Sequence, residues 1–243
     1  MLKTEDELLD PIPERAAPDG GPEPARRRRG HRRDAVIVLI GCASALVALG
    51  LIWAARAVVP RNLYVSELGV PGMPTEHVFM AALLCLVLGG AGIAWAARGV
   101  RSRPRALAWA PAVWLWVASV AFLMASQVRC VAGCVVAVGV PPHPVDLVHV
   151  AAAVLGFAAA CLAMLQAALV PGRPSVARPA AFACAAVVVL AGLGGLFGLL
   201  GFAVDASTWL EFAGTSVAIC WLAAFGAALA TGHLRAASAY ALA

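Results

Sequence analysis

The chain has 243 residues, of which 62% are hydrophobic and only 13% are charged, and its formal net charge is +5 at pH 7. An average globular protein has about 25% charged residues. The composition therefore excludes a soluble enzyme, a nucleic-acid-binding domain and a disulfide-rich secreted scaffold, and it implies that lipid surrounds most of the chain.

Residues 1–34 form the first unit, which we expect to be a disordered, basic, cytoplasmic arm. They hold 8 of the 18 Lys and Arg residues and 8 of the 13 Asp and Glu residues, together with several prolines. Such a segment cannot bury enough apolar area to offset the entropy lost on ordering. Its basic run, Arg26 to Arg33, directly precedes an apolar stretch, which favours contact with anionic lipid and argues against nucleic acid as a partner.

Six apolar stretches follow, each close to the ~20 residues that a bilayer requires. They cover residues 35–59, 77–97, 106–126, 146–169, 179–204 and 210–232. The expected fold class is all-α: an integral membrane bundle of six transmembrane helices over residues 35–232, followed by a short cytoplasmic tail at 233–243.

Basic residues predict the orientation of this bundle. If the N-terminus is cytoplasmic, 15 Lys and Arg residues lie on the inner side and only Arg56, Arg61 and Arg129 lie on the outer side. Cytoplasmic segments of membrane proteins carry such an excess of bases. We therefore expect a multi-pass protein of the plasma (cytoplasmic) membrane with both termini in the cytoplasm.

All five acids outside the arm fall on the predicted outer face. They are Glu67, Glu76, Asp146, Asp205 and Glu211. Three have local explanations at helix N-termini, where anions are favoured: Glu76 beside the capping candidate Thr75, Asp146 as a cap, and Glu211 in a capping box with Thr208. Asp205 is expected at the C-terminal end of the fifth span, where an anion is disfavoured, so it requires a partner or a role in the loop.

Two histidines on the same face, His77 and His149, are expected in the first turns of helices, where an imidazole tends to stay neutral. His149 follows Asp146 by three positions, so both side chains share one helix face. The pair suits either a structural hydrogen bond or acid–base and metal chemistry. The functional interpretation gains support because Ser66, several acids and the two histidines come from four segments at one depth.

Cys130 and Cys134 lie in the loop between the third and fourth predicted spans. On the outer side the compartment is oxidising, so we expect a disulfide. A redox pair or a zinc pair remains the alternative, because the spacing also suits zinc although that face offers only two cysteines. The other five cysteines fall inside predicted spans and are interpreted as small core residues.

Two stretches carry a family resemblance. Residues 61–69, RNLYVSELG, resemble the N-x-[YI]-[IV]-S-[DE]-L-G signature of the domain-of-unknown-function family 998, and residues 139–149, GVPPHPVDLVH, resemble its second signature. The resemblance covers about residues 35–232 and implies a six-span fold, similar to the DRAM/Sfk-type proteins, with a set of outer-face residues but no established reaction. The paired cysteines and the long arm are not part of that pattern.

Two functional hypotheses follow from this outer face. The first is a non-enzymatic membrane protein whose outward polar patch, including Glu67 and Glu211, binds a lipid head group, a small ligand or a partner protein. The second is an integral membrane hydrolase or lipid-modifying enzyme. Its catalytic candidates are Ser66, His77, Asp146, His149 and Asp205, and zinc enters only here, with His77, His149 and Asp205 as its ligands. The first hypothesis is favoured, because nearly every outer residue has a plausible local role.

Overall fold

The computed structural model describes residues 23–102, 110–131, 134, 139, 141 and 143–242, and the regular elements of this part of the chain are all helices. The elements in chain order are α1 (Glu23–Val58), η2 (Ser66–Gly69), α2 (Glu76–Ala96), η3 (Ala97–Gly99), α3 (Pro111–Gln127), α4 (Pro144–Ala168), α5 (Pro174–Leu199) and α6 (Val204–Leu242). This confirms the all-helical fold class within the described residues.

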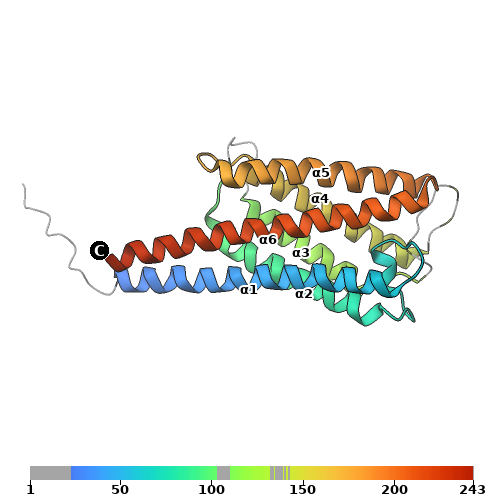
Figure 1. Ribbon diagram of the computed structural model, residues 1–243, viewed down its shortest axis with the longest axis horizontal. Helices are drawn as coiled ribbons and strands as arrows, with labels where there is room; N and C mark the ends of the chain where they lie inside the picture. The colour runs from blue at the N-terminus through green and yellow to red at the C-terminus, as the bar shows by residue number, and fades with distance from the viewer. Residues whose placement is uncertain are drawn as a thin grey trace, which may run out of the picture.

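The long helices form a ring in chain order. Each packs against the next, and α6 closes the ring by packing along α1 (Figure 1). We call the end of the bundle where α1 begins and α6 ends the terminal end, and the opposite end, which carries η2, the η2 end. At the terminal end α1 and α6 project together beyond the other helices.

Five of the helices, all except α3, are long and apolar enough to cross a membrane. Helix α3 is apolar but has only 17 residues. That length lies at the lower limit of about 17–25 residues for a transmembrane helix. The start of the predicted third span, residues 106–109, lies outside the described residues, as do Arg103 and Arg105 of the preceding loop.

The arm and the tail differ from the prediction. Helix α1 begins at Glu23, so residues 23–34, which the sequence predicts to be disordered, are helical, and α6 continues through the predicted tail to Leu242. A helix propagates easily once a turn has formed, and arginine is a good helix former, so the apolar part of α1 extends into the basic run. Residues 1–22 of the predicted arm lie outside the described residues.

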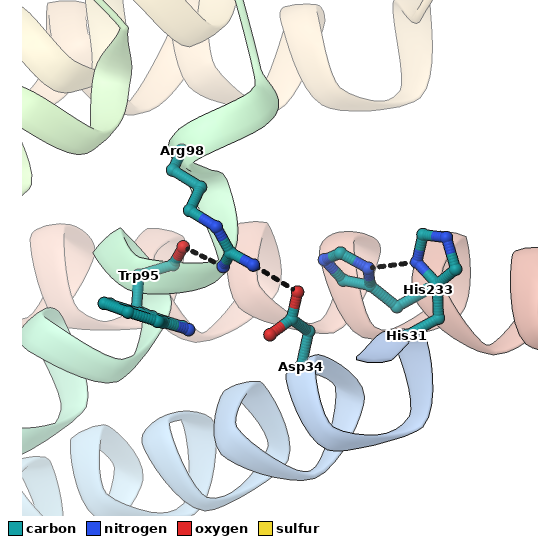
Figure 2. Close-up of polar contacts among 5 residues, drawn as sticks. All are labelled: His31, Asp34, Trp95, Arg98 and His233. Carbon is teal, nitrogen blue, oxygen red and sulfur yellow. Dashed lines mark hydrogen bonds and ion pairs between the residues drawn. The ribbon is translucent and has the colours of Figure 1, made fainter. Parts of the chain in front are cut away.

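Polar side chains join the helices at the terminal end (Figure 2). Asp34 of α1 forms an ion pair with Arg98 of η3 at 2.8 Å, and Arg98 also donates to the Trp95 carbonyl at 2.7 Å. The Nδ1 atoms of His31 in α1 and His233 in α6 lie 3.3 Å apart. The histidine contact joins α1 to α6 where these two helices project beyond the bundle, whereas Asp34 joins α1 to η3.

Small residues allow close packing between α1 and α2. A Cβ atom placed on Gly89 would lie 2.8 Å from the Gly41 carbonyl oxygen, so the two backbones touch at this point. Such approach is the expected role of glycine in membrane helices, where dispersion forces replace the hydrophobic effect between helices.

The connection between α5 and α6 is shorter than the sequence predicts. Helix α5 ends at Leu199 and α6 begins at Val204, and the intervening turn has positive φ angles at Gly201 and Ala203. Asp205 therefore lies in the first turn of α6 instead of at the end of the fifth span. The dipole argument against an anion at Asp205 was wrong, because a helix N-terminus stabilises a negative charge.

Candidate functional site

The short helix η2 covers the bundle at the η2 end, and its own side chains hold it in shape. The Tyr64 backbone N–H donates to the Glu67 carboxylate at 2.7 Å, and the Thr75 hydroxyl donates to the Leu68 carbonyl at 2.8 Å. Thr75 occupies the N-cap position of α2, but its side chain makes no capping bond there, contrary to the prediction. The hydroxyl fastens η2 to α2 instead.

Glu211 of α6 fastens η2 from the opposite side. Its carboxylate accepts a hydrogen bond from the Val65 backbone N–H at 3.1 Å and also contacts the backbone N–H of Ser66. The predicted capping box with Thr208 is not formed, because α6 begins earlier and Thr208 donates to the Asp205 carbonyl at 2.8 Å. Glu211 therefore contacts a separate segment of the chain and does not cap its own helix.

Asp146 and His149 both lie buried in the first turns of α4. The cap of α4 is His143, whose Nδ1 accepts from the Val145 N–H at 3.3 Å, while Asp146 accepts from the Val131 N–H at 2.7 Å. The predicted cap at Asp146 is thus replaced by a bond to the loop before α4.

The ring of His149 has one nitrogen fixed by the backbone at the C-terminal end of α3. Its Nδ1 lies 2.9 Å from the carbonyl oxygen of Ala125 and 2.7 Å from that of Val128. Since carbonyl oxygens only accept, Nδ1 must carry a proton, and Nε2 of the neutral ring keeps its lone pair.

Cys130 and Cys134 are joined by a disulfide, and both are buried. A ring nitrogen of His149 and the two sulfur atoms all lie within 4.8 Å of one another. Among the described residues this is the group of three His, Cys, Asp or Glu side chains that lies close together, but sulfur atoms joined in a disulfide have no thiolate to offer a metal ion. The donors that the sequence suggested for zinc, namely His77, His149 and Asp205, do not form such a group there.

A groove of about 390 Å³ runs between α4 and α5, and we call it the α4–α5 groove. Its sides are apolar, with Val150, Val154 and Phe157 on α4 facing Val188, Gly192 and Gly195 on α5. Val154 is 62% exposed and Val188 55% exposed, so the groove opens to the outside of the bundle along its length.

Polar side chains close the groove at the η2 end. We call this set the polar cap; it consists of Tyr64, Ser66, Cys134, His149 and Glu211. The rest of the lining continues toward the terminal end as far as Cys161, about 18 Å from His149 along α4 at about 1.5 Å per residue. The groove is therefore amphipathic, with one polar end and a long apolar body.

Most of the polar groups in the polar cap are hydrogen-bond acceptors. The Ser207 hydroxyl lies 2.6 Å from the Gly194 carbonyl and 3.1 Å from the Tyr64 hydroxyl. Because Ser207 has a single proton and the carbonyl can only accept, Tyr64 donates to Ser207 and keeps its own oxygen lone pairs. Tyr64 Oη, the Glu211 carboxylate and His149 Nε2 therefore suit a ligand head group that carries O–H or N–H donors.

A second cavity of about 90 Å³ lies in the centre of the ring and adjoins the groove. Both cavities have Ser66, His149, Phe157 and Glu211 in their linings. The central cavity also contains Thr215, a buried residue whose hydroxyl has no hydrogen-bond partner among the described residues. Buried hydroxyls normally have a partner, so Thr215 marks a place for a water molecule or a ligand atom.

Other residues proposed from the sequence lie apart from the cap. His77 is exposed in the first turn of α2, and neither it nor Asp205 lines either cavity. Glu76 accepts from the Gly72 N–H at 2.9 Å and forms an ion pair with Arg129. Its role is to connect α2 to the segment after α3.

Asp205 has the partner that the sequence argument required. Asn62 donates to its carboxylate at 2.9 Å, and Arg56 donates to the Asn62 side-chain oxygen at 2.9 Å. The Arg56 guanidinium also lies 4.9 Å from the ring centre of Trp209. This exposed chain connects the end of α1 to the start of α6.

Glu67 lies outside the membrane-spanning helices and is half-buried. Burial raises the pKa of its carboxyl group, against the smaller opposing effects of the Tyr64 N–H and the Arg61 guanidinium. Glu67 lines neither cavity, and its carboxylate accepts from the Tyr64 N–H, so Glu67 is not a member of the polar cap.

Sequence reasoning missed Tyr64, Ser207 and Thr215. Tyr64 stands in the motif that was singled out, but a tyrosine next to a span is ordinarily explained by the membrane interface. Ser207 and Thr215 lack a signal in the sequence, because helical serine and threonine usually bond to their own backbone.

Comparisons with family models, with curated proteins and with solved structures give no match to this chain. The resemblance to the domain-of-unknown-function family 998 therefore stays a prediction that rests on the two quoted stretches.

Proposed function

We propose that this chain is a multi-pass membrane protein that binds an amphiphilic lipid in the α4–α5 groove, with the lipid head group at the polar cap. The observation that carries the proposal is the amphipathic lining of the groove, which has its polar residues at one end and apolar residues along its body. Small-molecule sites generally combine an apolar lining with a few convergent polar groups.

The exposure of the groove supports a ligand that arrives from the bilayer. Val154 and Val188 are largely exposed on either side of it, so an apolar chain enters sideways between the helices. Burial of that chain against protein gains little over lipid, so selectivity comes from the head group. The acceptors Tyr64, His149 and Glu211 favour a head group with O–H or N–H donors.

The same proposal places the η2 end on the outer side of the cytoplasmic membrane. The basic run at the start of α1, Arg26 to Arg33, and Arg98 lie at the terminal end, as the positive-inside rule expects for a cytoplasmic face. In that orientation the basic run of α1 contacts anionic lipid head groups. Helix α3 acts as the sixth span.

A hydrolase remains a second candidate because Ser66 and His149 line the same two cavities. A serine nucleophile needs a base of this kind close to it. Labelling by a fluorophosphonate probe that is lost in Ser66→Ala supports the hydrolase, whereas no labelling of the folded protein argues against it. The metal-dependent form of this hypothesis is not supported, because the predicted zinc ligands His77, His149 and Asp205 do not come together among the described residues.

The lipid-binding proposal is tested by native mass spectrometry of the full chain in a mild detergent with added phosphatidylethanolamine. A Cβ atom on Gly195 meets nothing within 4 Å, so Gly195→Leu fills the groove without displacing the fold. Ala185→Leu is the matched control, because Ala185 is exposed on α5 and does not line the groove.

We expect the wild type and Ala185→Leu to retain one lipid per chain, and Gly195→Leu to lose most of it. Equal retention in all three proteins would contradict the proposal. Replacing glycine by leucine within a helix favours the helix, so a loss of binding is not expected to arise from unfolding.

A further inference from the structure

We propose that Cys130–Cys134 is a redox-active disulfide whose dithiol form passes two electrons to a lipid-soluble quinone held in the α4–α5 groove. This inference rests on the proposed function, because it names the class of amphiphile that the groove takes. The structure brings together a disulfide, an imidazole and a lipid-accessible groove at one point, the polar cap.

The position of the disulfide is the first support. Cys134 lines the groove, so a bound head group lies next to one member of the pair. The bond closes a loop of sequence separation 4. By the loop-entropy relation a loop that short contributes about 2 kcal/mol to stability, less than half of the ~4.7 kcal/mol of a 100-residue loop, so stabilisation accounts for the bond only in part. Cys134 also has a φ angle of 59°, a left-handed conformation that is strained for a residue other than glycine.

His149 supplies the second support. One of its ring nitrogens lies within 4.8 Å of both sulfur atoms. Nδ1 is held by the carbonyls of Ala125 and Val128, so Nε2 is the nitrogen with a free lone pair, and in this proposal it accepts the thiol proton. A cysteine beside an imidazole gives up its proton more easily, and the thiolate is the reactive form.

The proposed step balances. In the dithiol form the two S–H bonds of Cys130 and Cys134 break and one S–S bond forms, which releases two electrons and two protons. The quinone takes up both, so its two carbonyl groups become the two hydroxyl groups of a hydroquinone. His149 passes one of the protons. A dithiol substrate from outside the membrane returns the pair to its reduced form by thiol–disulfide exchange and is itself oxidised to a disulfide.

The chemistry of the polar cap favours the product of this step. A quinone presents only acceptors, whereas a hydroquinone presents two O–H donors. The acceptors Tyr64 Oη and the Glu211 carboxylate therefore bind the hydroquinone more strongly than the quinone, which pulls the electrons toward the groove. A quinone with an alkyl tail also matches the apolar body that follows the cap.

The test uses the full chain reduced with a phosphine, freed of reductant under anaerobic conditions and mixed with decylubiquinone. The fully substituted ring of this quinone does not form adducts with thiols readily. Differential alkylation with peptide mass spectrometry measures Cys130 and Cys134 separately from the five free cysteines. Absorbance follows the reduction of the quinone.

We expect one quinone to be reduced for each Cys130–Cys134 pair that closes in the wild type and in Ala185→Leu. We expect Gly195→Leu and Cys134→Ser to slow quinone reduction at least tenfold. His149→Gln, whose amide still donates to the two carbonyls, should close the disulfide at least tenfold more slowly than the wild type even when decylubiquinone is saturating. An equal rate in Gly195→Leu and Ala185→Leu would overturn the groove as the site of the quinone.

Binding is measured in the same samples by native mass spectrometry. If decylubiquinone or phosphatidylethanolamine is retained but Cys130 and Cys134 stay reduced, the redox inference is wrong and the lipid-binding proposal stands. If neither amphiphile is retained by a folded chain, the lipid-binding proposal itself is wrong and the inference falls with it.

Discussion

The carboxylate of Glu211 in α6 accepts a hydrogen bond from the backbone N–H of Val65, 3.1 Å away and 146 positions earlier in the chain. This bond holds the segment of η2 over the ends of the helices. Because Ser66 and Glu211 line both cavities, the same contact also forms the polar end of the groove. Fold and site therefore depend on one carboxylate.

Removing this carboxylate should destabilise the protein. Glu211→Ala leaves the N–H groups of Val65 and Ser66 without their acceptor, and an unsatisfied buried donor costs about 1–3 kcal/mol. Glu211→Gln keeps one acceptor oxygen and should cost less. Thermal unfolding in detergent measures both variants, and equal melting temperatures for Glu211→Ala and the wild type would show that the bond contributes nothing.

Asp205 should be dispensable for ligand binding. Its partner Asn62 and the following Arg56 form an exposed chain that lines neither cavity. We expect Asp205→Ala to lower the free energy of unfolding by about 1 kcal/mol or less, as exposed polar pairs do. Lipid retention in native mass spectrometry should be unchanged. If Asp205→Ala folds but retains no lipid, Asp205 contributes to lipid binding and this prediction is wrong.

The ion pair between Asp34 and Arg98 at the terminal end should contribute little and should depend on salt. The Arg98 side chain is 52% exposed and that of Asp34 only 13%, so water screens the pair on one side. A double-mutant cycle with Asp34→Ala and Arg98→Ala should give a coupling of about 0.2–1 kcal/mol. The coupling should shrink at high salt, and a coupling that salt leaves unchanged would argue for a buried pair.

Glu67 should make stability depend on pH in a defined direction. Burial raises the pKa of its carboxyl group in the folded protein above the unfolded value, so the folded state binds the proton more tightly. Its contribution to stability is complete below the unfolded pKa of about 4.3 and is lost as the pH rises through the folded pKa.

The measurement is thermal unfolding across this acidic range for the wild type and Glu67→Gln. The Gln variant cannot ionise, so the part of the pH dependence due to Glu67 should vanish. A wild type that instead gains stability from Glu67 as the pH rises through this range would contradict the assigned direction.

The helices were largely predictable because a chain in lipid must hydrogen-bond its backbone N–H and C=O groups within each segment. A long apolar run therefore indicates a helix. Their ends were less predictable. Helix α1 begins at Glu23 rather than Ala35, because arginines extend a helix that apolar residues have already started. The turn before Val204 depends on positive φ angles at Gly201 and Ala203, and the second of these has no signal in the sequence.

For the candidate site, the sequence predicted only the level along the bundle at which its residues lie. Ser66, His149 and Glu211 were singled out with His77 and Asp205, since all are polar residues near the same end of the bundle. Sequence position gives that depth, but not whether a side chain faces the ring, another segment or the exterior. His77 is exposed and Asp205 turns to Asn62, whereas His149 faces the cavities because α3 carbonyls hold its ring.

The central claim, that an amphiphile occupies the α4–α5 groove, is tested most directly by photocrosslinking from the groove wall. A diazirine amino acid at Val188 lies in the groove, and the same amino acid at Ala185 lies outside it on α5. After irradiation in membranes and mass spectrometry of the chain, the account predicts one lipid or quinone species enriched at position 188 over position 185. The same mixture of bulk phospholipids at both positions would contradict it.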